Sequence, residues 1–118
     1  MNIILFSRKQ VNHRPEQLRK MFASISRHGL EYSINEDFAM VVESLTDIRI
    51  DSLHRYCNLP PSTGDDILIT YGGDGTLLDA VELRPTPTTP IVGINCGRLG
   101  YLTQKIQSVF NFIALYLL

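Results

Sequence analysis

The sequence predicts an α/β fold, in which an open parallel β-sheet lies between helices on both of its faces, in three layers. Apolar segments rich in β-branched residues, at 2–6, 67–71 and 91–94, have the length and composition of buried strands. Other segments, the first beginning at Pro15, carry apolar residues at helical spacing. The resulting order, β-α-β-α-β-α-β, is typical of parallel strands joined by helical crossovers. At 118 residues the chain suits a single domain of this kind.

The first half of the chain contains two of the expected helices. Pro15 suits a first helical turn, and apolar residues recur at helical spacing until Gly29, the type of residue that commonly follows a helix. A short strand is expected at 30–34. Asn35 then begins the second helix, whose apolar positions continue to Val42.

The region from 46 to 61 is the hardest to assign. Ile48 and Ile50 alternate with polar neighbours, as residues of a strand do, and residues 53–56 are compatible with a helical turn. The Pro-, Ser- and Asp-containing stretch at 60–66 is a loop by composition. It leads into the buried strand at 67–71, and the Pro-rich stretch at 84–90 is a second, stiff connector.

The strand at 67–71 ends in residues 72–76, Gly-Gly-Asp-Gly-Thr, and a helix is expected to begin near Thr76. Glycines let backbone N–H groups approach a ligand closely, and a helix N-terminus favours phosphate. A pure phosphate site has no need of the Asp74 carboxylate. Asp74 can hold a Mg²⁺ ion that bridges phosphate oxygens, or accept a proton from an attacking hydroxyl, and both roles predict phosphoryl transfer.

Other interpretations of this loop fit less well. A P-loop needs a Lys-Ser or Lys-Thr pair after its last glycine, and none follows Gly75. The dinucleotide fingerprint needs a glycine where the chain has Leu78, and an acidic residue about twenty positions further on, where it has Asn95 and Cys96. The alternative without a ligand is a tight strand-to-helix turn with an ordinary Asp or Thr cap.

Composition argues against several classes of partner. Lys plus Arg number 11 and Asp plus Glu number 12, so no overall field would attract nucleic acid or an anionic membrane. Cys57 and Cys96 have neither metal-type nor redox-type spacing, which favours reduced thiols and a cytoplasmic location. His13, His28 and His54 are scattered, so we expect no protein metal site.

Two cations lie in the loop that follows the first expected strand. Arg8 and Lys9 lie at the carboxyl end of residues 2–6, and in open parallel sheets this is the edge where ligands bind. They can therefore help to neutralise phosphates. Two cations in an exposed loop are, however, more commonly just solvated.

A second glycine-rich segment, residues 93–102, reads Gly-Ile-Asn-Cys-Gly-Arg-Leu-Gly-Tyr-Leu. Its Tyr101 can lie against a nucleobase or simply pack on the sheet. Together with Gly-Gly-Asp-Gly-Thr-Leu-Leu at 72–78, and at this distance from it, the segment resembles the NAD kinase family. Close variants of the first motif also occur in lipid kinases and phosphofructokinases, whereas the second is more particular to NAD kinases. The resemblance covers roughly residues 3–103 and implies a Rossmann-like N-terminal domain of the NAD kinase/phosphofructokinase type.

The resemblance implies transfer of the γ-phosphate of ATP to the adenosine 2′-hydroxyl of NAD, which makes NADP. Asp74 matches the catalytic aspartate that takes the proton from that hydroxyl. Mg²⁺ or another divalent cation would come with ATP rather than occupy a protein site. The implied contacts to NAD are Asp74, Gly75, Leu78, Tyr101 and Leu102, and the implied phosphate loop is Gly72, Gly73, Gly75 and Thr76.

Two departures from the family pattern bear on these expectations. Many members have a basic residue five positions after the catalytic aspartate, where this chain has Asp79, which we expect to face solvent. Members also continue into a β-rich second domain. We therefore assign residues 1–105 to the N-terminal domain and the apolar residues 106–118 to the start of a second one. These last residues are too few to span a bilayer, which takes about twenty apolar residues.

The isolated chain is accordingly expected to lack activity, and the full-length form to be a homo-oligomer. The residues leave two other interpretations open: a lipid or sugar kinase relative that shares the loop, and a non-catalytic nucleotide-binding fragment. They also leave open whether polyphosphate replaces ATP and whether NADH is accepted.

Overall fold

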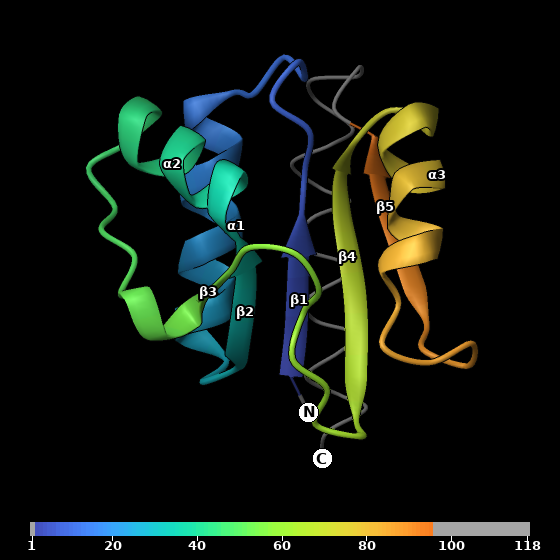
Figure 1. Ribbon diagram of the computed structural model, residues 1–118. Coiled ribbons are helices and arrows are strands. Elements are labelled where there is room, and N and C mark those ends of the chain that lie inside the picture. The colour runs from blue at the N-terminus through green and yellow to red at the C-terminus, as the bar shows by residue number, and fades with distance from the viewer. Residues whose placement is uncertain (1, 96–118) are drawn as a thin grey trace.

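In the part of the chain that the structure describes, five parallel strands form a sheet in the order β3-β2-β1-β4-β5 (Figure 1). The computed structural model describes residues 2–95, so the expected domain boundary at 105 and the apolar residues 106–118 lie outside the described residues. The strands are β1 (Asn2–Phe6), β2 (Glu31–Asn35), β3 (Arg55–Tyr56), β4 (Asp66–Gly72) and β5 (Ile91–Asn95). The helices are α1 (Pro15–Arg27), α2 (Glu36–Leu45) and α3 (Asp74–Leu83), with a 3₁₀ turn η1 (Ser52–His54).

The sheet separates two apolar cores. Alternate residues of β1 point to opposite faces, so Ile3 and Leu5 lie in one core while Ile4 and Phe6 lie in the other. Helices α1 and α2 contribute to the first core and α3 to the second. Figure 1 shows α1 and α2 beside β2 and β3, and α3 beside β4 and β5. The predicted three-layer α/β class, with helices on both faces of a parallel sheet, is confirmed.

The boundaries of the first two helices follow the signals in the sequence. Pro15 opens α1, where its fixed φ suits the helix and its missing N–H is not needed. Gly29, just past the end of α1, has a φ of 62°, the left-handed conformation that commonly terminates a helix. The Asn35 side chain caps α2 by accepting a hydrogen bond from the N–H of Phe38 at 3.2 Å. The predicted starts of α1 and α2 are confirmed, and α3 begins at Asp74, two residues before the predicted start.

The expected strand at Ile48 and Ile50 is wrong. Thr46 Oγ1 accepts a hydrogen bond from the Ile48 N–H at 3.1 Å, and the Glu43 carboxylate accepts one from the Ile50 N–H at 3.1 Å. Because side chains take these N–H groups, they do not pair with a strand. The helical turn expected over 53–56 is correct only in its first part, since η1 is followed by the short edge strand β3, which pairs with β2.

Arg55, in β3, ties the edge of the sheet to α2. Its guanidinium donates to Glu36 at 3.1 Å, to Glu43 at 2.6 Å and to the backbone oxygen of Ile50 at 3.0 Å. The hydrogen bond from the Ile50 N–H, followed by the one from Arg55, holds the pKa of Glu43 below its ordinary value. The folded protein therefore favours the ionised form of this carboxyl.

Glu43 is expected to make the fold less stable at acid pH. A carboxyl whose pKa is lower in the folded state stabilises the fold above its ordinary pKa of 4.5, and this contribution is lost as the pH falls through the folded value. Between about pH 5 and pH 3, the urea midpoint of the wild type should therefore fall more than that of Glu43→Gln. If the urea midpoints of the two proteins fell by the same amount over this pH range, Glu43 would have no such role.

Candidate active site

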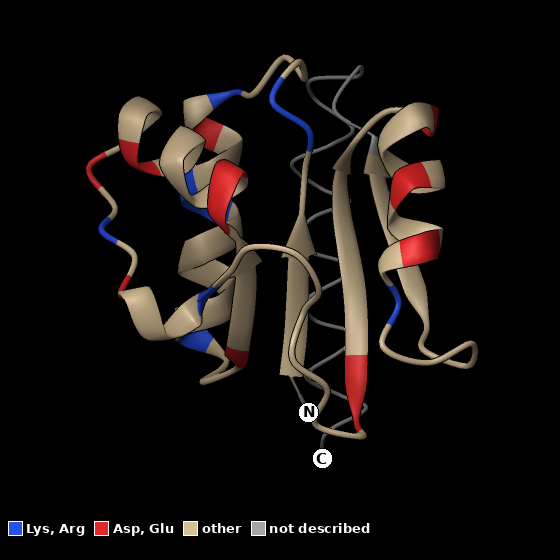
Figure 2. Ribbon diagram, viewed as in Figure 1, with Lys and Arg blue, Asp and Glu red and all other residues tan. Residues whose placement is uncertain are grey.

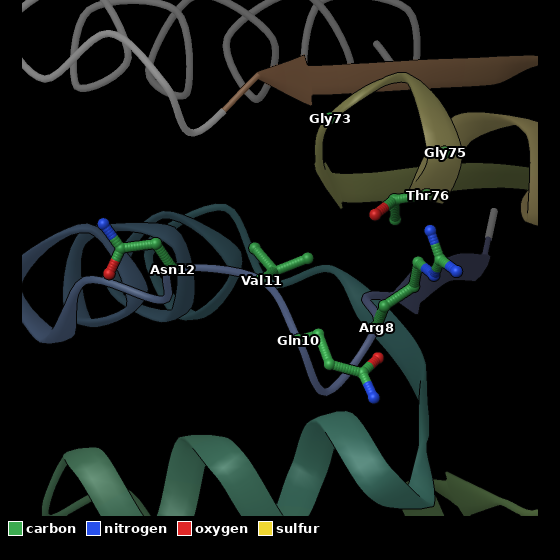
Figure 3. A pocket seen from close by; sticks show the side chains of 7 residues that line it. All are labelled: Arg8, Gln10, Val11, Asn12, Gly73, Gly75 and Thr76. Carbon is green, nitrogen blue, oxygen red and sulfur yellow. The ribbon is translucent and has the colours of Figure 1, made fainter.

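The order of the strands reverses between β1 and β4. β1 pairs with β2 on one side and with β4 on the other, so the loops after β1 and β4 leave the same edge of the sheet. In open parallel sheets, ligands bind at such a switch point. A cavity of about 300 Å³ opens there between the two loops (Figure 3). Its walls are formed by Arg8, Gln10, Val11, Asn12, Gly73, Gly75 and Thr76.

The glycine loop connects the end of β4 directly to the first turn of α3. Gly73 is the N-cap residue of this helix, and no side chain caps it. The backbone bond from the Leu77 N–H to the Gly73 oxygen, at 3.2 Å, is the first of the helix. The preceding N–H groups have no helical acceptor, and such groups are suited to an anion. Gly73 and Gly75 line the cavity, so this donor set lies at its wall.

Gly72 and Thr76 are packed against each other inside the loop. Gly72 has a φ of 157°, and a Cβ placed on it would overlap Oγ1 of Thr76 and lie only 2.8 Å from its Cβ. Thr76 is 2% exposed. A Cβ on Gly73, in contrast, would have no heavy atom within 4 Å. The sequence predicted glycines that admit a ligand, and at Gly72 the structure adds a packing reason that involves no ligand.

Asp74 is the first residue of α3, and its side chain is exposed to solvent. Within residues 2–95, no ion pair or side-chain hydrogen bond involves its carboxylate. Its neighbours Gly73 and Gly75 line the cavity, whereas Asp74 itself does not. Asp74 is therefore an exposed residue beside two cavity-lining glycines, without being part of the cavity wall.

The other residues implied in NAD binding are placed differently. Leu78, in the second turn of α3, is 70% exposed. Tyr101 and Leu102 lie outside the described residues. The described part of the site thus consists of the glycine loop, Asp74, Leu78 and the loop after β1.

The pairing of Arg8 with Asp79 was not predicted. Arg8 Nε lies 3.0 Å from Asp79 Oδ2, so an ion pair bridges the loop after β1 and helix α3. Figure 2 shows the basic segment after β1 and the acidic positions along α3. Asp79 was expected to face solvent, and its side chain is indeed 49% exposed, but it has a partner. The signal in the sequence is opposite charge on two elements that follow adjacent strands.

Ser7, directly after β1, connects the loop after β1 to the end of β4, where the glycine loop begins. Its hydroxyl is 2.6 Å from the backbone oxygen of Tyr71, to which it donates, and 2.8 Å from Nε2 of His13. Ser7 is 2% exposed, and the His13 ring packs against that of Tyr71 at 5.7 Å between centroids. Burial lowers the pKa of His13, although a hydrogen bond to the Val11 backbone acts in the opposite direction. These contacts hold the end of β1 against the start of the glycine loop.

Replacing Ser7 by alanine is expected to lower the free energy of unfolding by about 1–2 kcal/mol. The change leaves the buried Tyr71 carbonyl without this donor. Ser44→Ala is the matched control, because the Ser44 hydroxyl also donates to a backbone oxygen, that of Val41, but is exposed. Urea unfolding at neutral pH should place the midpoint of Ser7→Ala clearly below that of Ser44→Ala. Equal midpoints would mean that the Ser7 hydroxyl does not hold the two loops together.

Two kinds of feature are absent from residues 2–95. The structure has no group of three or more His, Cys, Asp or Glu side chains that could hold a metal ion in this part of the chain. Within the same range, none of the helices has the length and apolar character needed to cross a membrane.

Comparisons with known proteins agree with this fold. The family model described as the ATP-NAD kinase N-terminal domain matches residues 5–115. The NAD kinase of Flavobacterium psychrophilum is 30% identical over 118 residues, which represent 99% of this chain and 40% of the relative. The NAD kinase of Caldicellulosiruptor saccharolyticus is 51% identical over 72 residues, which represent 61% of this chain and 28% of the relative.

A solved structure, described as yeast NADH kinase complexed with NADH, superposes with a TM-score of 0.62 at 20% identity. The match covers 97% of this chain and 36% of the yeast chain, and at that identity it shows a shared fold. The curated relatives are longer, and this chain spans between 20% and 40% of their length. Since the family model matches nearly the whole chain, the protein belongs to the NAD kinase family, of which it carries the N-terminal domain.

Proposed function

We propose that this chain provides the phosphoryl-transfer loop of an NAD kinase, which moves the γ-phosphate of ATP to the adenosine 2′-hydroxyl of NAD. The observation that carries the proposal is the exposed Asp74 carboxylate on a glycine loop at the switch point of the sheet. Membership of the family supplies the identity of the two substrates. The loop supplies what phosphoryl transfer needs, namely backbone donors for phosphate and a nearby base.

In this proposal Asp74 takes the proton of the 2′-hydroxyl of NAD, while the oxygen of that hydroxyl forms a bond to the γ-phosphorus of ATP. The bond between that phosphorus and the bridging oxygen breaks, and ADP leaves. N–H groups at Gly73, Gly75 and Thr76 hold the phosphates in line with the hydroxyl. Gly75 and Leu78, with Tyr101 and Leu102, contact NAD. The exposed apolar surface of Leu78 suits such a contact, because a bound ligand would cover it.

Mg²⁺, or another divalent cation, is proposed to accompany ATP. The described loop fits this arrangement, because it offers the single carboxylate of Asp74 beside backbone N–H donors, a set suited to an ion that brings its own phosphate ligands. Such an ion would neutralise charge on the phosphates. A homo-oligomeric full-length form, a cytoplasmic location and polyphosphate as a second donor belong to the same proposal.

The test is NADP formation, followed with an NADP-specific dehydrogenase. This chain would replace the matching 40% of the Flavobacterium psychrophilum NAD kinase, and the chimera would be assayed with ATP and NAD. We expect NADP to form, and we expect the 118-residue chain alone to bind ATP without turnover. A chimera that is folded by circular dichroism, yet phosphorylates a lipid or a sugar and not NAD, would contradict the proposal.

A further inference from the structure

Arg8 is the one Lys or Arg side chain, among residues 2–95, that lines the cavity beside the glycine loop. We propose that Arg8 binds a phosphoryl group of the nucleotide through the terminal nitrogens of its guanidinium, and that Asp79 is the positioning residue that holds it there. The inference rests on the proposed function and deepens it, because it assigns a side chain to the phosphate site. Neither residue carries a role in the implied set of loop and NAD contacts.

The geometry of the Arg8 guanidinium leaves its outer edge available. Nε donates to Asp79 at 3.0 Å, on the side of α3. Nη1 lies against Gly75, only 2.5 Å from the position that a Cβ on this glycine would occupy. Figure 3 shows the side chain extending from the loop after β1 toward the turn that carries Gly75 and Thr76. With Nε engaged, the two terminal nitrogens remain as a fork, the shape that binds phosphate through two parallel hydrogen bonds.

The absence of a side chain at Gly75 is what allows this approach. Any Cβ at this position would displace Nη1 of Arg8 from the loop. A phosphate at the first N–H groups of α3 would thus meet backbone donors and the Arg8 fork together. Gly75 has an explanation in this contact that is separate from a direct contact with NAD.

Stability alone is a weak explanation for the pair between Arg8 and Asp79. Their side chains are 47% and 49% exposed, and ion pairs at such exposure contribute little to folding. Fixing a long side chain before the ligand arrives, in contrast, lowers the conformational entropy that binding must otherwise remove. The pair therefore has more effect on binding than on the fold.

Charge balance at the loop points the same way. Asp74 and Asp79 both carry negative charge within the first two turns of α3, and each would repel a triphosphate. Lys9 does not offset them, because it pairs with Asp37 of α2 at 3.5 Å and does not line the cavity. Among residues 2–95, Arg8 is thus the cation that is placed to compensate for the two carboxylates.

The experiment measures binding of ATP and of inorganic tripolyphosphate to the 118-residue chain by titration calorimetry. Arg8→Gln removes the fork and the charge, while Arg8→Lys retains the charge but not the fork. Lys9→Gln is the matched control, because it removes the neighbouring cation from the same loop. Circular dichroism and thermal unfolding establish that each variant is folded.

We expect Arg8→Gln to lower the affinity for both ligands about tenfold or more, and Arg8→Lys to lower it less, by about three- to fivefold. Lys9→Gln should change neither by more than about twofold. Asp79→Asn is measured at about 0.3 M salt, where the loss of its own charge is largely screened. There, Asp79→Asn should lower the affinity for tripolyphosphate about threefold when Arg8 is present. The same change in the Arg8→Gln background should leave the affinity unchanged. Asp79→Glu should restore the affinity of the wild type.

The outcomes separate this inference from the function on which it rests. If the wild type binds ATP and Arg8→Gln binds it equally well, Arg8 has no role and the proposed function stands. If Arg8→Gln weakens binding but Asp79→Asn does not, Arg8 binds phosphate and the positioning role of Asp79 is overturned. If the folded wild type binds neither ligand, the phosphate loop itself is refuted, and the inference with it.

Discussion

Asparagine in place of Asp74 is expected to slow NADP formation by about 10²- to 10⁴-fold, the usual contribution of a positioned general base. The amide has nearly the shape of the carboxylate but cannot accept the proton of the 2′-hydroxyl. Asp74 is exposed, and no ion pair or side-chain hydrogen bond involves it within residues 2–95, so its replacement should leave the fold intact. The loss should therefore appear in kcat, while KM for ATP and NAD changes little.

The assay for Asp74→Asn is the same coupled measurement on the chimera. Glu82→Gln is the control, since it removes another exposed carboxylate from α3 that does not line the cavity. Glu82→Gln should retain nearly full activity. If Asp74→Asn retained more than about half of the wild-type kcat, Asp74 would not be the base, and the proposed mechanism would need another proton acceptor.

The sequence predicted most of the sheet because its strands are marked locally. Strands β1 and β4, which are buried along their length, and β5, which is buried only at Ile94, are all marked by apolar runs. The proline and asparagine at the starts of α1 and α2 are short-range signals. The prediction failed at Ile48 and Ile50, where alternation resembled a strand. Side chains of Thr46 and Glu43 bind those N–H groups, and a periodicity of apolar residues does not contain that information.

The site was predicted in part for a similar reason. The glycine loop is contiguous, so its composition indicated the turn that the structure shows between β4 and α3, while its preference for phosphate stays a prediction. The bond from Ser7 to Tyr71 joins residues separated by 64 positions, and it exists only because β1 and β4 are neighbours in the sheet. The ion pair of Arg8 with Asp79 also depends on that pairing. Strand order was not determined by the β-α pattern, so neither contact could be derived from it.

Alanine at Gly72 is expected to lower the free energy of unfolding by about 3 kcal/mol or more. Two costs combine: a φ of 157°, which residues with a Cβ rarely adopt, and overlap of the new methyl with Thr76. The loop has little room to relax, because Thr76 is 2% exposed and Cγ2 of Val11 would also be only 3.1 Å from the methyl. Urea unfolding at neutral pH measures the effect through the midpoint and the m-value.

Gly73→Ala is the matched control for this change, one residue further along the loop. Its φ of −104° suits any residue, and its Cβ would have no heavy atom within 4 Å, so the only expected cost is that of alanine at an N-cap. The free energy of unfolding should fall by no more than about 1 kcal/mol. Combining Gly72→Ala with Thr76→Ala removes Oγ1 and should restore part of the lost stability, because the atom that the new methyl overlaps most is then absent. If Gly72→Ala and Gly73→Ala unfold at the same urea concentration, Gly72 is not required by packing, and its place in the loop would have to be explained by the ligand alone.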